Sequence, residues 1–240
     1  MKYMGSKARI KKEILPLILK DRKENQYFVD LMCGGMNLID GVEGNRIAND
    51  LNFYLIEMWK ELLKGWKPEK FYSKDFYNEV KNNKEKFPPY LVGWIGFICS
   101  YSGKWFGGFA GEYPETRRLK NGDLPCYQNE SRNSIFKQIE FLKEVKFESK
   151  NYFEVQIPKN SIIYFDPPYK GTTKYFTEFD HDFFYNYVRK LKNEGHQVFV
   201  SEYEMPSDFI CIWEKEVKSS LSANGKIGGS KSSVEKLFTL

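Results

Sequence analysis

Three short apolar runs that each lead into an aspartate constrain the fold of this chain more than any other feature. The runs end at Asp30, Asp50 and Asp166, and stretches with helical spacing of apolar residues alternate with them. This alternation is typical of parallel strands joined by crossover helices. Because ligands bind beyond the carboxyl ends of such strands, the three carboxylates are expected to converge on one crevice. For Asp30 and Asp50 taken alone, acids that only cap loops explain the pattern equally well.

The order of these patterns predicts an α/β fold whose parallel sheet is interrupted by one insertion. Residues 1–65 and 146–240 carry the strand and helix patterns, whereas residues 66–145 are rich in aromatic, glycine, proline and charged residues. We therefore expect the first two ranges to form one domain and the third to be inserted into it. Helices are predicted over residues 8–20, with a kink or early stop at Pro16, and over residues 36–39, 54–64, 133–145 and 180–195.

Composition narrows the class of protein only slightly. The 240 residues include 37 Lys and Arg against 32 Asp and Glu, and this net charge of +5 is compatible with a polyanionic partner without demanding one. The four cysteines lie far apart, and neither His181 nor His196 stands at ligand spacing with a cysteine, so no metal site is expected. No apolar run is long enough to span a membrane. We expect a cytoplasmic protein with reduced thiols.

The motif Asp166-Pro167-Pro168-Tyr169 directly follows the third apolar run and carries the most specific chemistry. An adenine amino group is a poor nucleophile because its lone pair is delocalised into the ring. The Asp166 carboxylate and the Pro167 carbonyl, held beside that amine, would accept both of its hydrogens and favour a pyramidal nitrogen. The two prolines restrict the backbone, so this carbonyl is aimed in advance. Tyr169 would stack on the base, which has to leave the duplex to be reached.

A structural alternative for this motif is a rigid Pro-Pro turn with a packed tyrosine. The glycines after Asp30, Gly34 and Gly35, would let a ligand approach the backbone, but Met36 interrupts the usual triplet. As a nucleotide-binding signal, these two glycines are weak without other support.

Taken together, these motifs resemble the DNA adenine methyltransferase family of the D12 class, in its α-type order. The resemblance covers nearly the whole chain and implies a Rossmann-like methyltransferase sheet with helices on both faces and an inserted target-recognition domain. Leu31, Met32 and Met36 stand where the family usually has Pro, Phe and Gly, and Asn151 stands where Asp is usual. The motifs that carry the resemblance are Lys2-Tyr3-Met4-Gly5-Ser6-Lys7, residues 28–35, residues 48–52, Asn151-Tyr152-Phe153, Asp166-Pro167-Pro168-Tyr169, residues 220–225 and Val234-Glu235-Lys236-Leu237.

The resemblance also implies the cofactor, the reaction and the residues that serve them. The cofactor is S-adenosylmethionine, the substrate is double-stranded DNA, and the catalytic domain comprises residues 1–65 and 146–240. The catalytic residues are expected to be Asp166, Pro167, Pro168 and Tyr169. The cofactor is expected to contact Tyr3, Lys7, Asp30, Cys33, Gly34, Gly35, Asp50, Asn151 and Asp166.

The inserted residues 66–145 are expected to recognise DNA. Basic and aromatic residues alternate there, and the Asn121-Gly122 pair predicts a hairpin that could enter a groove, where an arginine can read guanine. A merely solvated surface is the alternative, because several acids dilute the charge. The expected DNA contacts are Lys104, Arg117, Arg118, Lys120 and Arg132.

Two other functions compete with adenine methylation in DNA. One is methylation of a different target, such as cytosine N4 or an RNA adenine, because the amine chemistry is alike. The other is a non-catalytic DNA-binding protein on a decayed methyltransferase scaffold. The sequence leaves open the methylated site, the oligomeric state and whether a restriction endonuclease accompanies the protein.

Overall fold

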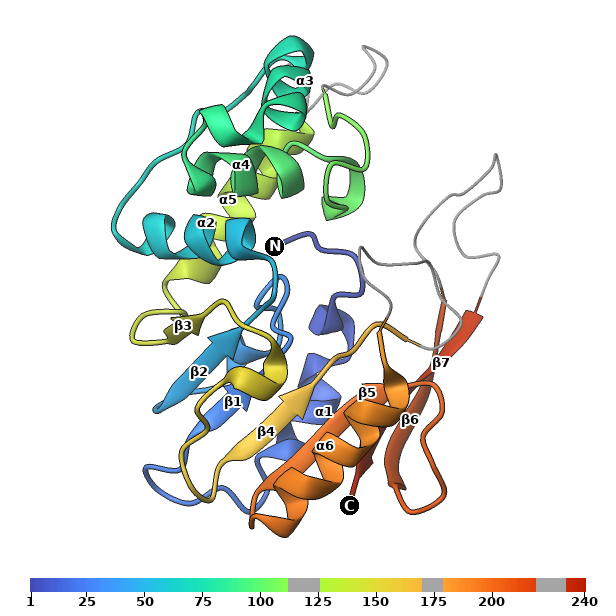
Figure 1. Cartoon of the computed structure of the whole chain (residues 1–240). Helices are drawn as coiled ribbons and strands as arrows, with labels where there is room; N and C mark the ends of the chain where they lie inside the picture. The colour runs from blue at the N-terminus through green and yellow to red at the C-terminus, as the bar shows by residue number, and fades with distance from the viewer. Residues whose placement is uncertain (112–125, 170–178, 219–231) are drawn as a thin grey trace.

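A seven-stranded sheet with the strand order β3-β2-β1-β4-β5-β7-β6 forms the framework of the computed structural model (Figure 1). The structure describes residues 1–111, 126–169, 179–218 and 232–240. The first five strands of this order are parallel, and β7 runs antiparallel to both of its neighbours. The described strands are β1 (Phe28–Asp30), β2 (Arg46–Asn49), β3 (Lys146–Glu148), β4 (Ile162–Phe165), β5 (Gln197–Glu202), β6 (Ile210–Lys218) and β7 (Ser232–Thr239).

Along the chain, the described helices lie before β1 and between successive strands. The α-helices are α1 (Lys11–Ile18), α2 (Phe53–Leu63), α3 (Lys74–Asn82), α4 (Pro89–Phe97), α5 (Tyr127–Ile139) and α6 (His181–Asn193). The short 3-10 helices are η1 (Lys7–Arg9), η2 (Ile39–Gly41), η3 (Lys84–Lys86), η4 (Tyr101–Gly103) and η5 (Tyr152–Glu154). Within the described ranges, no helix is both long and apolar enough to cross a membrane.

The strand order reverses between β1 and β4. From β1 the chain builds outward through β2 to β3, and it then returns to place β4 on the other side of β1. In open α/β sheets, ligands bind at the carboxyl ends of the strands where this reversal occurs. Asp30 ends β1 and pairs in register with Tyr164, so Asp30 and Asp166 lie at neighbouring strand ends.

Side chains of successive strand residues enter cores on opposite faces of the sheet. Phe28 and Ile162 belong to the larger core, which includes residues of α1 and α2, whereas Val29 and Ile163 belong to the core that includes residues of α6. This two-residue alternation is the geometry of a strand that is buried on both sides. The fold is therefore a Rossmann-like α/β fold with helices on both faces, as the sequence predicted.

The described part of residues 66–145 is helical and contributes no strand to the sheet. Figure 1 shows α3, α4 and α5 gathered beyond the end of the sheet toward which β2 points. α4 packs tightly on α2, because a Cβ added at Gly93 would lie 2.1 Å from the Tyr54 carbonyl oxygen. The division of the chain at residues 65 and 146 stays a prediction, and the hairpin predicted at Asn121-Gly122 lies outside the described residues.

The structure corrects two predicted helices. In place of a helix over residues 36–39 the chain forms only η2, because Gly34 and Met36 have left-handed φ values of 45° and 59° that no α-helix contains. The helix predicted over residues 133–145 is α5, which begins at Tyr127 and ends at Ile139. Arg46 accounts for this early end, since its guanidinium donates to the carbonyl oxygens of Phe141 at 2.5 Å and Lys143 at 2.7 Å.

Other local predictions are confirmed. Asp180 caps α6 by accepting a hydrogen bond from the Phe183 backbone N–H at 2.9 Å, and Gly195 follows the helix with φ 89°. α1 ends at Ile18, two residues after Pro16, which agrees with the expected early stop. The C-terminal strands β6 and β7 were not predicted from the sequence.

Replacing Gly93 by alanine tests the contact between α2 and α4. Alanine normally stabilises a helix by about 1 kcal/mol relative to glycine. Here the added methyl group meets the Tyr54 carbonyl, so we expect Gly93→Ala to lower the free energy of unfolding by about 1–3 kcal/mol. Urea unfolding measures the change, with Ser134→Ala on the exposed face of α5 as the control. A stabilised Gly93→Ala protein would contradict this packing.

Candidate active site

Four side chains from three separate parts of the chain meet at the carboxyl end of β4. Lys7 Nζ lies 2.8 Å from Asp166 Oδ1 and 3.9 Å from Glu235 Oε2. The Tyr169 hydroxyl donates a hydrogen bond to the same Glu235 oxygen at 2.9 Å. Lys7 Nζ also lies 4.9 Å from the centre of the Tyr169 ring. The Asp166-Pro167-Pro168-Tyr169 motif therefore belongs to a charged cluster that draws on the N-terminal segment and the last strand.

Local structure explains why each of these side chains reaches the cluster. Ser6 caps η1 by accepting a hydrogen bond from the Ala8 backbone N–H at 3.2 Å, and this cap positions Lys7. Asp166 directly follows β4, whose four residues are all buried. Glu235 lies two residues before Leu237 on β7 and so shares its face, which is the face of the larger core.

Burial and charge act against each other at Asp166. Burial raises the pKa of this carboxyl above its usual range, and the nearby Glu235 charge raises it further. The Lys7 ammonium and the Tyr169 hydroxyl favour the ionised form and lower the pKa of Asp166. Only 7% of the Lys7 side chain and 21% of the Asp166 side chain are exposed, so water screens this ion pair weakly.

Tyr169 stays protonated and acts as a hydrogen-bond donor. Burial raises the pKa of its hydroxyl well above the usual value, and the charges of Asp166 and Glu235 add to this effect. Its ring meets the ring of Tyr203 edge-on at 4.5 Å between centroids. Tyr203 directly follows β5, and Glu235 lies on β7. The surroundings of Tyr169 therefore include residues from the two strands that follow β4 in the sheet order.

Asp30 is a buried carboxylate whose interactions within the described chain are incomplete. Its exposed fraction is 2%, and its Oδ1 atom has no hydrogen-bond partner among the described residues. Burial raises the pKa of this carboxyl well above its usual range, and the charge of Asp166 raises it further, while a hydrogen bond from the Met32 backbone lowers it. A buried oxygen without a donor is costly, and it is the feature that a ligand with N–H or O–H groups would relieve.

The glycine turn after β1 is held from two sides. The Gly34 backbone N–H donates to Asp50 Oδ2 at 3.0 Å, and the other oxygen of Asp50 accepts from the Asn52 backbone at 2.8 Å. On the other side lies Tyr3, because a Cβ added at Gly34 would lie 2.5 Å from Tyr3 Cε1. A Cβ at Gly35 would lie 2.6 Å from Tyr3 Cβ. The close approach for which the glycines are needed is made here by the Tyr3 side chain.

The remaining expected cofactor residues have structural partners. Cys33 is buried, and burial raises the pKa of its thiol well above the usual value, so it stays neutral. Asn151 caps η5 in a reciprocal capping box with Glu154. Tyr152 lies among aromatic residues of the smaller core, at 6.1 Å between ring centroids from Phe165.

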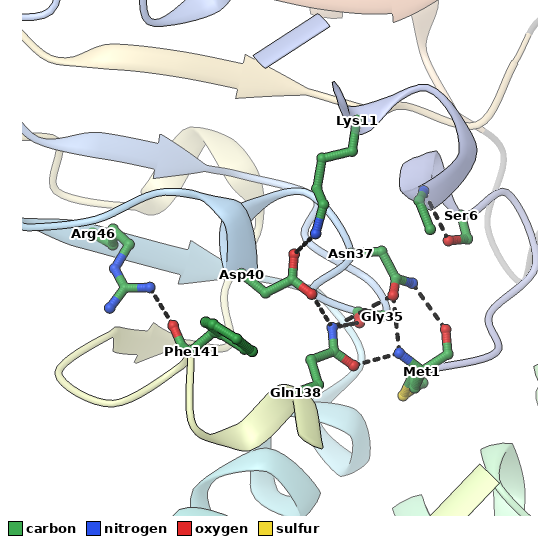
Figure 2. Close-up of polar contacts among 10 residues, drawn as sticks. Met1, Ser6, Lys11, Gly35, Asn37, Asp40, Arg46, Gln138 and Phe141 are labelled. Atoms are coloured by element: carbon green, nitrogen blue, oxygen red, sulfur yellow. Dashed lines mark hydrogen bonds and ion pairs between the residues drawn. The ribbon is translucent and has the colours of Figure 1, made fainter. Parts of the chain in front are cut away.

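A buried polar network joins α5 to the glycine turn (Figure 2). Gln138 is 6% exposed, and its Nε2 donates to the Gly35 carbonyl at 3.1 Å and to Asp40 Oδ2 at 2.9 Å. Its Oε1 accepts a hydrogen bond from the Met1 amino group. The other oxygen of Asp40 accepts from Lys11 Nζ at 2.7 Å. Gln138 therefore connects the helical segment of residues 66–145 to the turn that follows β1.

Of the expected DNA contacts, the structure describes only Lys104 and Arg132. Lys104 is exposed. Arg132 already has partners within the protein, since its Nε donates to the Pro68 carbonyl at 2.9 Å and its guanidinium lies 4.6 Å from the centre of the Phe136 ring. Arg117, Arg118 and Lys120 lie outside the described residues.

The sequence did not assign Glu235, Tyr203 or Gln138 to the site. Glu235 stands in a motif that the sequence singled out, but nothing local indicated that its side chain reaches Lys7. Gln138 carried no signal beyond its place in a predicted helix. No group of three or more potential metal ligands occurs among the residues that the structure describes.

Comparison with known families gives one match that covers most of the chain. The family model described as D12 class N6 adenine-specific DNA methyltransferase matches residues 3–90 and 109–215. The matched ranges contain Lys7, Asp30, Asp50 and the Asp166-Pro167-Pro168-Tyr169 motif. They end before β7, so Glu235 lies outside the match.

Replacing Asp30 by asparagine tests whether this carboxylate weakens the fold. Because its folded pKa is raised, the wild-type protein loses stability as the pH rises above the unfolded value of about 3.9. We expect Asp30→Asn to raise Tm by a few degrees at neutral pH, with a gain that shrinks as the pH falls toward about 4. Thermal unfolding across this pH range measures it, with exposed Asp75→Asn as the control. A variant less stable than wild type at neutral pH would show that the carboxylate is paired.

Proposed function

Because the chain belongs to the D12 class N6 adenine-specific DNA methyltransferase family, we propose that it transfers a methyl group from S-adenosylmethionine to adenine N6 in specific double-stranded DNA sites. The observation that carries this proposal is the position of Asp166-Pro167-Pro168-Tyr169. The motif lies at the carboxyl end of β4, beside the reversal of strand order and next to Asp30. A ligand site is expected at this place in an open α/β sheet.

The residues at this edge fit the proposed cofactor. S-adenosylmethionine carries amino and hydroxyl donors and a positive sulfonium, and the Oδ1 atom of Asp30 is a buried acceptor without a donor among the described residues. Asp50 directly follows the neighbouring strand β2 and presents a second carboxylate beside the glycine turn. We propose that Tyr3, Lys7, Asp30, Cys33, Gly34, Gly35, Asp50, Asn151 and Asp166 hold this cofactor.

The catalytic residues would act mainly by holding the target amine. When bound, the cofactor supplies a methyl group activated by the sulfonium, so that the N–C bond forms as the S–C bond breaks. The Asp166 carboxylate and the Pro167 carbonyl accept the two amine hydrogens and turn the nitrogen lone pair toward the methyl group. The proton that the methylated nitrogen loses passes to Asp166 and then to water.

The remaining two residues of the motif would fix geometry. Pro167 and Pro168 lock the backbone φ angles. The acceptor carbonyl is therefore already in place, and the backbone does not have to reorganise during the reaction. Tyr169 stacks on the adenine. Since the amine cannot be reached within a base-paired duplex, the base is flipped out of the stack before transfer.

DNA contacts are proposed for Lys104, Arg117, Arg118, Lys120 and Arg132. Arginine recognises guanine through two hydrogen bonds in the major groove, and lysine pairs with phosphate as a point charge. Arg132 has part of its hydrogen-bonding capacity occupied by Pro68. Arg117 and Arg118 are therefore the stronger candidates for reading bases.

Replacing Asp166 by asparagine tests the proposed acceptor. The amide keeps the shape of the side chain but removes the charge that holds the amine and takes the proton, so we expect methyl transfer to fall by about a thousandfold or more. Transfer of tritium from labelled S-adenosylmethionine to adenine in duplex DNA measures the rate. Exposed Asp75→Asn is the matched control. Turnover of a folded Asp166→Asn protein near the wild-type rate would refute the mechanism, and tritium in cytosine would refute the adenine target.

Two arginine variants test DNA recognition. Arg117→Ala and Arg118→Ala remove guanidinium groups that we assign to DNA, and each is expected to weaken DNA binding by about tenfold while cofactor affinity is unchanged. Fluorescence anisotropy at fixed salt measures both affinities. Arg132→Ala serves as a contrast, because loss of its contacts with Pro68 and Phe136 should lower Tm as well. Wild-type DNA affinity in both Arg117→Ala and Arg118→Ala would place recognition elsewhere.

A further inference from the structure

Glu235 is the charged group of the active site that the proposed reaction leaves without a role. Its carboxylate lies on β7 and is 17% exposed. Its Oε2 atom accepts a hydrogen bond from the Tyr169 hydroxyl at 2.9 Å and lies 3.9 Å from Lys7 Nζ. The Lys7 ammonium and the Tyr169 hydroxyl thus both lie near one carboxylate oxygen of Glu235.

The arrangement of Lys7 conflicts with the proposed role of Asp166. Lys7 Nζ donates to the Gly5 carbonyl at 3.0 Å and lies 2.8 Å from Asp166 Oδ1. An adenine amine that binds Asp166 therefore competes with the ammonium for this carboxylate. Lys7 is only 7% exposed, so an ammonium that leaves Asp166 without a new counter-charge would be buried and unpaired, which is strongly unfavourable.

Glu235 is placed to resolve this conflict. The 3.9 Å between Lys7 Nζ and Glu235 Oε2 is longer than a hydrogen bond, and a small rotation of the lysine side chain would close it. The Glu235 oxygen that would receive the ammonium is the one that now holds the Tyr169 hydroxyl. Because a carboxylate oxygen accepts more than one hydrogen bond, this oxygen can hold the ammonium and the hydroxyl together.

We propose that Glu235 is a positioning residue that serves as a second counter-charge for Lys7. Without a target base it accepts the hydrogen bond of the Tyr169 hydroxyl, and when an adenine amine binds Asp166 it also receives the Lys7 ammonium. This inference rests on the proposed function, since it assumes that Asp166 binds the target amine. It gives β7, the last strand along the chain, a part in preparing the site. This strand lies outside the family match.

Charge and shape at position 235 are separated by two substitutions. Glu235→Gln keeps the length and an oxygen that accepts the Tyr169 hydroxyl but removes the charge needed by Lys7. Glu235→Asp keeps the charge on a shorter side chain. We expect single-turnover methyl transfer to fall by about tenfold or more in Glu235→Gln, and Glu235→Asp to be faster than Glu235→Gln.

The pH dependence of transfer provides a readout that a purely structural role would not move. The groups that act on Asp166 or lie against it are Lys7, Glu235, Tyr169, Tyr164 and Asp30. The Glu235 charge raises the pKa of Asp166, so its removal lowers that pKa. The acidic limb of the single-turnover rate, which follows ionisation of Asp166, should therefore shift to lower pH in Glu235→Gln.

The control and the contrary outcomes keep this inference distinct from the proposed function. Glu216→Gln removes an exposed glutamate of the neighbouring strand β6 and should match wild type in rate and Tm. If the wild-type protein methylates adenine and Glu235→Gln is equally fast, the role of Glu235 is overturned and the proposed function stands. Glu235→Asp slower than Glu235→Gln, or an unmoved acidic limb, would overturn it as well. A folded wild-type protein that never methylates adenine would instead overturn the proposed function.

Discussion

The ion pair between Lys7 and Asp166 is the interaction on which the arrangement around the Asp166-Pro167-Pro168-Tyr169 motif depends. It joins the N-terminal segment to the end of β4, and it supplies the positive charge that opposes burial of the Asp166 carboxylate. Asp30 and Glu235 lie at the same edge of the sheet. The charge of Glu235 raises the pKa of Asp166, and the charge of Asp166 raises the pKa of Asp30. A single buried ammonium thus faces more negative charge than it neutralises. Such a site favours cationic ligands and donors of hydrogen bonds.

The same edge connects the N-terminal segment and the glycine turn to the helical segment of residues 66–145. Tyr3 lies against Gly34 and Gly35 and also packs at 5.6 Å between ring centroids from Phe97 at the end of α4. Gln138 of α5 donates a hydrogen bond to the Gly35 carbonyl (Figure 2). The glycine turn is therefore contacted both by the N-terminal segment and by the helical segment of residues 66–145.

Local sequence patterns predicted β1, β2 and β4 and the helices α1, α2 and α6, because side-chain periodicity and capping act over a few residues. They did not predict β3, β6, β7, α3 or α4. β4 and Asp166, the cap at Asp180 and the stop at Gly195 follow directly from such patterns. Two helix predictions were wrong, each for its own reason. The chain after Gly34 turns through left-handed residues, and Arg46, far away in sequence, binds the carbonyls that follow α5.

The sequence by itself determined the strands that lead into Asp30, Asp50 and Asp166, the Asp166-Pro167-Pro168-Tyr169 motif and the family to which the chain is similar. Only the tertiary structure decided that β7 pairs with β5 and brings Glu235 to Lys7 and Tyr169, and that Gln138 reaches Gly35. The physical reason is that strand order and helix docking depend on packing between distant segments. The periodicity of a strand or helix indicates which face a residue occupies. It does not indicate which residue of another element lies opposite.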